Sequence, residues 1–177
     1  MTYMVGMGLS VAAMIRVGNQ LGRREYLKLK EVAQSIFFLT LLLQISFALF
    51  FLIFRNDLPH LYLDSSDVEN GLDNAYVLGL ASVLLLWSAL FQISDGIQVV
   101  IIGALRGMQD VRVAAVITFV SYWLVGFPIS YYLGLKTDLG AEGIWMGLLA
   151  GLTVSSILLY VRFNYLVTHK INIHVTT

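Results

Sequence analysis

The sequence predicts an all-α membrane protein, a bundle of five transmembrane helices. Of its 177 residues, 58% are hydrophobic and only 12% are charged, about half the charged fraction of an ordinary soluble domain. The apolar residues fall into five long runs separated by polar segments. Such a chain must bury apolar surface in something other than itself, and a bilayer is the solvent that fits.

The predicted spans are residues 1–22, 32–54, 72–103, 113–133 and 143–166. The first has only about fifteen apolar-leaning residues before Arg16, fewer than the roughly 20 that a spanning helix needs. We therefore expect either a helix cut off at its N-terminus or a Met1 that is not the natural start, and thus a fragment or the tail of a longer protein. The third run exceeds one bilayer thickness, which predicts that it tilts, kinks or extends beyond the membrane.

The connectors are polar. Residues 23–31 are basic and predict a solvated loop that fixes topology, or else a short amphipathic helix at the interface. The long loop at 55–71 holds His60, Asp64 and Asp67, but their spacing does not imply the convergent geometry of a metal site. No metal is therefore predicted, and His60 is expected to be a solvated loop residue.

Basic residues are distributed unevenly, which predicts the topology. Nine of the eleven Lys and Arg residues lie in or beside the first connector, the third connector and the tail: Arg16, Arg23, Arg24, Lys28, Lys30, Arg106, Arg112, Arg162 and Lys170. Because basic loops stay in the cytoplasm, the C-terminus is predicted to be cytoplasmic and the first end external. The absence of cysteine excludes disulfides and thiolate metal sites, and the zero net charge disfavours a nucleic-acid partner.

Asp95 is the main candidate functional residue, because it lies deep inside the third span. A charge there costs about 2.5 kcal/mol or more and marks a functional site by default. Ser88, Gln92 and Gln98 share its helical stripe, which predicts a polar ridge that faces a cavity or another helix. A carboxyl group poised between burial and a nearby cation can exchange a proton for Na⁺ or a cationic substrate. The alternative is a neutral packing carboxyl held by Gln92 or Ser94.

Aromatic residues in the spans have two readings. They can form the interfacial belt or pack between helices, or they can face a cavity and stack on a planar organic cation. Tyr122, in the middle of the fourth span, is the best cavity candidate, together with Phe91, Gln92 and Gln98 around Asp95. Pro128 in the same span is predicted to kink it, because proline removes a backbone hydrogen bond.

Two further motifs are read as structural. The fifth span carries a doubled GxxxG pattern: Gly143, Gly147 and Gly151. Small residues at this spacing let another helix approach closely. Arg106 and Arg112 flank Asp110 in the third connector, which predicts a cytoplasmic anchor with a local ion pair, or alternatively a gating element.

Four segments together resemble the MATE (multidrug and toxin extrusion) family, in particular its bacterial NorM-like branch. They are residues 15–22 (IRVGNQLG), 91–98 (FQISDGIQ), 103–110 (GALRGMQD) and 121–128 (SYWLVGFP). Their order and spacing match the eighth to twelfth of that family's twelve helices, so the resemblance covers nearly the whole chain. One departure is Ala114-Ala115, where the family usually has a proline, and this change leaves Asp95 untouched.

The resemblance implies a partial C-terminal lobe, residues 1–177, of an inner-membrane antiporter. Such a protein exports organic cations in exchange for Na⁺ or H⁺ and needs no cofactor besides the coupling ion. Asp95 matches the acidic residue of the tenth helix that takes part in cation coupling. The family's partner carboxylate on the seventh helix and its N-terminal lobe are missing from this sequence. The implied partners are therefore the bilayer, those missing segments and a small organic cation.

Other functions are less well supported. A flippase for a lipid-linked carrier needs basic residues inside its spans to hold phosphates, and these spans contain almost none. An intramembrane aspartyl protease needs two buried carboxyl groups, and a metalloprotease needs a motif such as HExxH, which is absent. We expect a transporter segment and not an enzyme, and we expect the isolated chain to be a truncated fragment that does not transport.

Overall fold

The computed structural model describes residues 2–55, 57, 58 and 71–176, and all regular secondary structure in these ranges is helical. The chain makes five helical passes: α1 (Thr2–Gly22), α2 (Tyr26–Ile53), α3 (Gly71–Gly107), a continuous pass formed by α4 (Val111–Ser121), η2 (Tyr122–Gly126) and α5 (Phe127–Leu135), and α6 (Ala141–Thr176). The prediction of an all-α bundle is confirmed. The loop residues His60, Asp64 and Asp67 lie outside the described residues.

Within the described residues, four passes are long and apolar enough to cross a membrane: α2, α3 from Leu78, the α4–η2–α5 pass, and α6 to Asn172. The predicted span at residues 1–22 forms α1, whose 21 residues are long enough but are not among the helices apolar enough to cross. The prediction of a loop up to residue 31 is wrong, since α2 already begins at Tyr26. The physical reason is that Leu29 is fully buried in the core, while Lys28 pairs with Glu25 at 3.1 Å.

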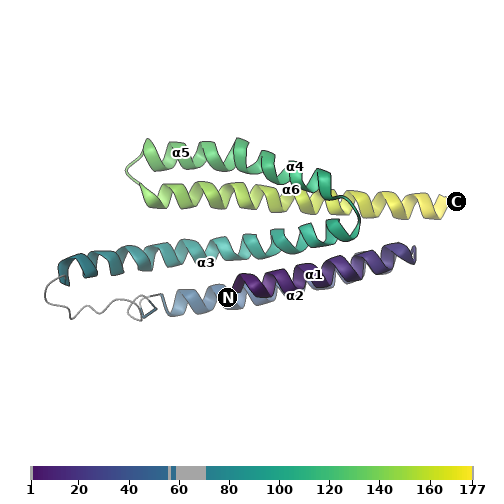
Figure 1. The fold of residues 1–177 in the computed structure, drawn as a ribbon, viewed down its shortest axis with the longest axis horizontal. Coiled ribbons are helices and arrows are strands. Elements are labelled where there is room, and N and C mark those ends of the chain that lie inside the picture. The colour runs from purple at the N-terminus through teal and green to yellow at the C-terminus, as the bar shows by residue number, and fades with distance from the viewer. Residues whose placement is uncertain (1, 56, 59–70, 177) are drawn as a thin grey trace.

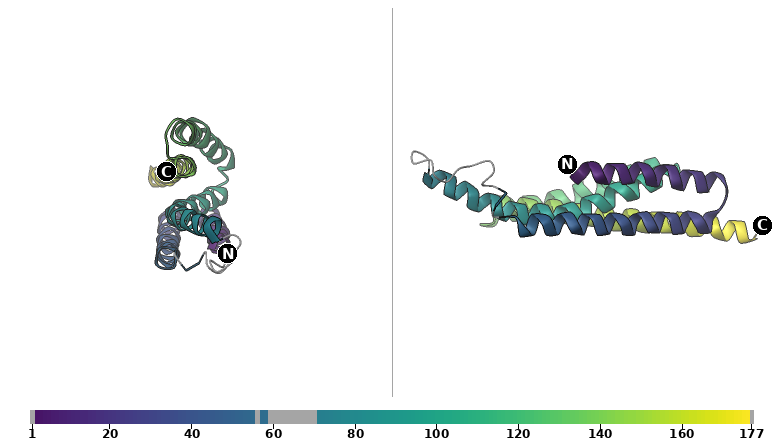
Figure 2. Two further views of the ribbon diagram at one scale, coloured as in Figure 1. Left: turned by 90° about the vertical axis from the view of Figure 1, so that its left-hand side faces the viewer. Right: turned by 90° about the horizontal axis from the view of Figure 1, so that it is seen from below.

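Helix α3 is the centre of the bundle. It packs against α1 and α2 on one side and against α6 on the other, and the α4–η2–α5 pass lies along α6 (Figure 1). The 37 residues of α3 correspond to roughly 55 Å of helix, and its first turns project beyond the other helices (Figure 2). The prediction that the third element is longer than a bilayer is confirmed.

Glycines of α3 allow α1 to approach its backbone. A Cβ atom on Gly103 would collide with the backbone of Ser10, and one on Gly107 would lie 2.5 Å from the carbonyl oxygen of Met14. The Ser10 hydroxyl donates to the carbonyl of Val99 at 2.8 Å across the same contact. These two glycines have GxxxG spacing, a signal of close helix packing that is visible in the sequence.

The glycines of α6 lie at its contact with η2 and α5. A Cβ atom on Gly143 would lie 2.5 Å from the carbonyl carbon of Leu133, one on Gly147 would collide with Ser130, and one on Gly151 would approach the backbone of η2 to 2.8 Å. The two helices therefore meet almost backbone to backbone, which is the arrangement that small residues at four-residue spacing allow.

The fourth pass widens into a π-helical turn at η2. The backbone N–H of Phe127 donates to the carbonyl of Tyr122, five residues earlier. Pro128 follows at the start of α5. Because Pro128 has no N–H to give the preceding turn, the helix relaxes into this wider spacing. Tyr122 begins the widened turn, and π turns of this kind occur frequently at functional sites.

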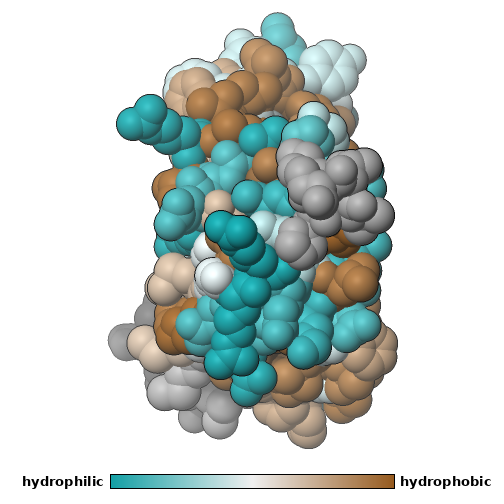
Figure 3. All heavy atoms as spheres, turned by 90° about the vertical axis from the view of Figure 1, so that its right-hand side faces the viewer, coloured by the Kyte–Doolittle hydropathy of each residue, from teal (hydrophilic) through white to brown (hydrophobic). Residues whose placement is uncertain are grey.

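One end of the bundle is rich in basic residues, and we call it the basic end. It comprises the α1–α2 turn, the first turns of α2, the α3–α4 turn and the last turns of α6, with the residues Arg23, Arg24, Lys28, Lys30, Arg106, Arg112 and Lys170. Viewed from this side, hydrophilic side chains gather over the end of the molecule (Figure 3). The long apolar faces lie along the helices, away from this end.

Candidate functional site

Asp95 lies in the middle of α3 and is half-buried. It has no hydrogen bond or ion pair with any residue in the part of the chain that the structure describes. It does interact electrostatically with Tyr122 of η2. An acid that is placed inside a helix bundle without a protein partner is costly, which makes it a candidate functional group.

Gln98 and Tyr122 join Asp95 from two different elements. Gln98, on the next turn of α3, is only 5% exposed. The Tyr122 hydroxyl donates to the side-chain oxygen of Gln98 at 3.4 Å. The structure therefore gathers an acid, an amide and a phenol from α3 and η2, and these groups offer oxygen atoms of the kind that hold hard cations.

Gln92 takes part in a chain of hydrogen bonds that ties three helices together. Thr2 Oγ1 of α1 donates to Gln92 Oε1 at 3.2 Å, and Gln92 Nε2 donates to Gln44 Oε1 of α2 at 3.2 Å. Gln44 is 3% exposed, and its side chain occupies the space that a Cβ on Gly96 would need. The sequence suggested a hydrogen bond from Gln44 to another helix, but it did not indicate that this bond lies beside Asp95.

Phe91 is half-buried and packs edge-to-face against Trp145 of α6, with 5.7 Å between ring centroids. Neither hydrogen bond of the packing alternative forms within the described ranges: Gln92 is bonded to Gln44, and the Ser94 hydroxyl is 3.2 Å from Thr153 Oγ1. The structure thus gathers Gln98 and Tyr122 with Asp95, while Phe91 and Gln92 contact α6 and α2 instead.

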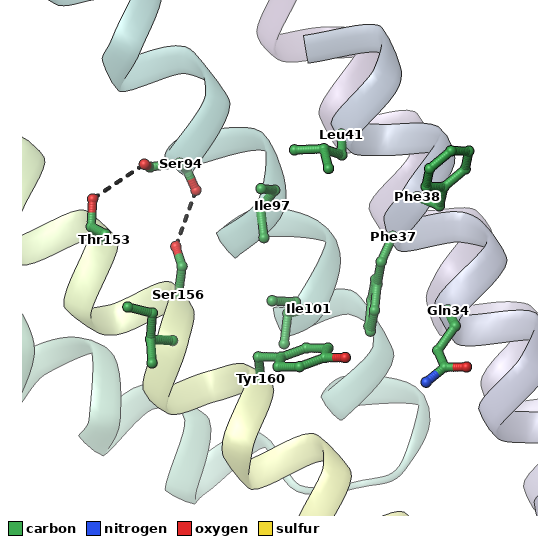
Figure 4. Close-up of a pocket in the computed structure, with 11 residues that line it drawn as sticks. Gln34, Phe37, Phe38, Leu41, Ser94, Ile97, Ile101, Thr153, Ser156 and Tyr160 are labelled. Atoms are coloured by element: carbon green, nitrogen blue, oxygen red, sulfur yellow. Dashed lines mark hydrogen bonds between the residues drawn. The ribbon is translucent and has the colours of Figure 1, made fainter. Parts of the chain in front are cut away.

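A second feature lies on another face of α3. A groove of about 530 Å³ runs between α2, α3 and α6 (Figure 4). Its lining is mostly aromatic and aliphatic, and comprises Gln34, Phe37, Phe38, Leu41, Ser94, Ile97, Ile101, Thr153, Ser156, Ile157 and Tyr160. Asp95 is not among these residues. Nothing in the sequence indicated this groove, because it depends on how far α2 and α6 stand apart across α3.

Asp110 does form an ion pair, but not with the neighbouring arginines that the sequence suggested, so that prediction is wrong. Asp110 Oδ2 accepts a hydrogen bond from Nε of Arg162, on α6, at 2.8 Å, and no ion pair with Arg106 or Arg112 is found among the described residues. The preceding Gln109 has a φ of 66°, a left-handed conformation that turns the chain sharply at this point. The pair joins the α3–α4 turn to α6 at the basic end.

This arrangement defines a class of protein, a multi-pass helical membrane protein with an unpaired ionisable group inside its bundle. Groups of this kind mark ion or substrate pathways. The family follows from comparison with known proteins. The chain belongs to the MatE family, whose model matches residues 1–132.

Curated relatives carry multidrug resistance names. The chain is 38% identical over 164 residues to a probable multidrug resistance protein NorM of Rhodopseudomonas palustris, an alignment that covers 93% of this chain and 34% of the relative. It is 39% identical over 169 residues to multidrug resistance protein MdtK of Yersinia pseudotuberculosis, covering 93% and 35%. The chain therefore spans about a third of the length of the curated relatives it matches.

Solved structures show the same fold. The eukaryotic MATE transporter AtDTX14 superposes with a TM-score of 0.79 at 21% identity, covering 96% of this chain and 37% of that one. An inward-facing multidrug resistance MATE family transporter of the MOP superfamily superposes with a TM-score of 0.80 at 17% identity, covering 97% and 38%. The resemblance identified from the sequence is confirmed, and the five passes correspond to part of a MATE transporter.

Proposed function

We propose that this chain forms part of a secondary antiporter that exports organic cations in exchange for Na⁺ or H⁺, with Asp95 as the group that exchanges the coupling ion. The observation that carries the proposal is the state of Asp95: it lies inside the bundle beside Gln98 and Tyr122, without an ion-pair or hydrogen-bond partner among the described residues. An unpaired acid can accept either a cation or a proton.

The proposed mechanism is alternating access, in which helical bundles rock around a site near the membrane midplane. The rigid part is the α1–α3 contact, where glycine packing and the Thr2–Gln92–Gln44 bonds fix the helices around Asp95. The adaptable part is the widened turn at η2, which carries Tyr122. We place the basic end at the cytoplasmic face of the inner membrane, so that the C-terminus is also cytoplasmic.

The test uses a chimaera, because the chain spans only about a third of the length of its relatives. This chain replaces the corresponding segment of the Rhodopseudomonas palustris NorM relative, and the chimaera is expressed in bacteria that lack their own drug pumps. Asp95→Asn should abolish ion-driven drug efflux at unchanged protein level, because the neutral amide cannot exchange a proton or balance a cation. The matched control is Asp138→Asn in the exposed α5–α6 turn, which should retain efflux.

Efflux by Asp95→Asn equal to that of the unmodified chimaera would make Asp95 a structural residue and remove the proposed mechanism. A companion measurement concerns the 177-residue chain alone in liposomes. We expect no drug-dependent Na⁺ or H⁺ flux from it, because about two thirds of the length of its relatives has no counterpart in it. Flux from the chain alone would show that the five passes suffice.

A further inference from the structure

The groove between α2, α3 and α6 has a lining that suits a hydrocarbon chain. At its inner end the hydroxyl groups of Ser94, Thr153 and Ser156 already have hydrogen-bond partners. The Ser94 hydroxyl lies 3.2 Å from Thr153 Oγ1, and the Ser156 hydroxyl donates to the Ser94 carbonyl at 3.1 Å; both bonds are visible in Figure 4. The lining contains no acid to pair with a cation, and an occupant meets mainly aromatic and aliphatic carbon, with Gln34 and the Tyr160 hydroxyl as the remaining polar groups.

The groove is open to the side. Phe38 on α2 is 66% exposed and Ile157 on α6 is 58% exposed, so the two walls stand apart towards the surroundings of the bundle. Each wall belongs to a helix that is long and apolar enough to cross a membrane. A lipid tail can consequently enter laterally from the bilayer, without passing through the bundle interior.

The groove also has a direction. Leu41, Ser94 and Thr153 lie at its inner end, and Gln34 and Tyr160 lie towards the basic end (Figure 4). The helix rises roughly 10 Å from Ser94 to Ile101, seven positions further on, well below the roughly 30 Å of the hydrocarbon layer. The groove therefore serves one leaflet, the leaflet at the basic end.

The positive charge at the mouth of the groove favours a lipid with an anionic headgroup. Lys30 lies one helical turn before Gln34 on the same stripe of α2, and no ion pair occupies it among the described residues. Besides Arg162, the partner of Asp110, the surrounding basic end holds Arg23, Arg24, Lys28, Lys30, Arg106, Arg112 and Lys170, against the acids Glu25, Glu31 and Asp110. Glu25 and Asp110 are already paired, so the free charge there is positive and complements an anionic headgroup.

We propose that this groove is a binding site for one anionic phospholipid from the basic-end leaflet, with an acyl chain between Phe37, Ile97 and Ile157 and its phosphate near Lys30. Such a lipid bridges α2 and α6 across α3, on a different face from Asp95. The proposal does not depend on transport and holds or fails separately from the antiport mechanism.

The experiment places the 177-residue chain in lipid nanodiscs and counts the lipids it retains by native mass spectrometry. Phosphatidylglycerol and phosphatidylcholine with the same acyl chains are compared. We expect one phosphatidylglycerol molecule to be retained preferentially by the unmodified chain. Equal retention of the two lipids would overturn the proposal, and this comparison needs no variant.

Two pairs of variants locate the lipid. Ile157→Trp fills the groove, while Val161→Trp makes the same change one turn away at a residue that is equally exposed, 58% in both cases, and is outside the lining. The first should lose the retained phosphatidylglycerol and the second should keep it. Lys30→Gln should weaken phosphatidylglycerol binding about fivefold, and Lys136→Gln, at the opposite end, should not. Retention by Ile157→Trp, or indifference to Lys30→Gln, would contradict the assignment.

Discussion

Two faces of α3 use polar residues in opposite ways. On one face, Asp95 has no bonded partner among the described residues, and its neighbours Gln98 and Tyr122 come from separate elements. On the other face, the hydroxyls of Ser94, Thr153 and Ser156 bond to one another or to backbone carbonyls. Both faces lie at similar depth in the bundle, so burial alone does not distinguish them.

The difference lies in which groups are satisfied. A polar group whose bonds are complete contributes to packing and offers little to a ligand, whereas an unpaired ionisable group is costly and is retained for a use. The face of α3 whose polar groups are hydrogen-bonded therefore has a structural role and offers a surface for apolar ligands. The face that carries the unpaired Asp95 is the one we propose for ion exchange.

The largest expected effect comes from closing the space between α1 and α3. Gly103→Ala adds a Cβ that collides with the Ser10 backbone, and backbone cannot swing aside as a side chain can. We expect the free energy of unfolding to fall by about 3 kcal/mol, at the upper end of overpacking penalties, with loss of the geometry around Asp95. Denaturant titration of the chain in mixed micelles measures this.

Gly79→Ala provides the matched control on the same helix. A Cβ at Gly79 meets nothing within 4 Å, so this change should be neutral or should stabilise by about 0.5–1 kcal/mol through better helix propensity. Equal effects of the two substitutions would mean that the close contact with α1 does not hold this face of α3.

A smaller effect is expected at the hydrogen-bond chain beside Asp95. Gln44→Leu keeps the side-chain volume but removes the acceptor of Gln92 Nε2. Hydrogen bonds between membrane helices average about 0.6 kcal/mol and reach about 1.7, and the buried position of Gln44 favours the upper part of that range. The same titration checks it; a stability unchanged by Gln44→Leu would show that the chain of bonds does not hold the three helices.

The smallest effect is expected on the satisfied face. Ser156→Ala removes a hydroxyl that is shared between the carbonyls of Ser94 and Leu152. Because backbone carbonyls of a helix retain their own N–H partners, the loss should not exceed about 0.6 kcal/mol, and efflux by the chimaera should not change. A loss of efflux as large as that of Asp95→Asn would erase the distinction between the two faces.

The sequence predicted much of this architecture because its signals are local. Charge scarcity and run length are sufficient to find the passes, and helical periodicity is sufficient to place Gln98 beside Asp95. The close contact at Gly103 and Gly107 was also within reach, since its spacing is that of the motif at Gly143.

Pairings between distant residues were not predictable in this way. Gln92 and Gln44 are 48 positions apart, and Asp110 and Arg162 are 52 apart. Periodicity gives the face of a helix on which a residue lies, but not which helix packs there or in what register. For Asp110 the nearest arginines in sequence suggested the wrong partner, because the turn at Gln109 directs the chain towards α6.

The most direct test of the central claim observes the Asp95 carboxyl group itself. Infrared difference spectra of the chimaera, recorded on adding Na⁺ or a cationic drug, report whether a protonated carboxyl becomes ionised. The account predicts a decrease in the carboxylic acid C=O band on addition of the ligand, which is absent in Asp95→Asn and retained in Asp138→Asn. An identical difference spectrum from Asp95→Asn would contradict the claim that Asp95 exchanges the coupling ion.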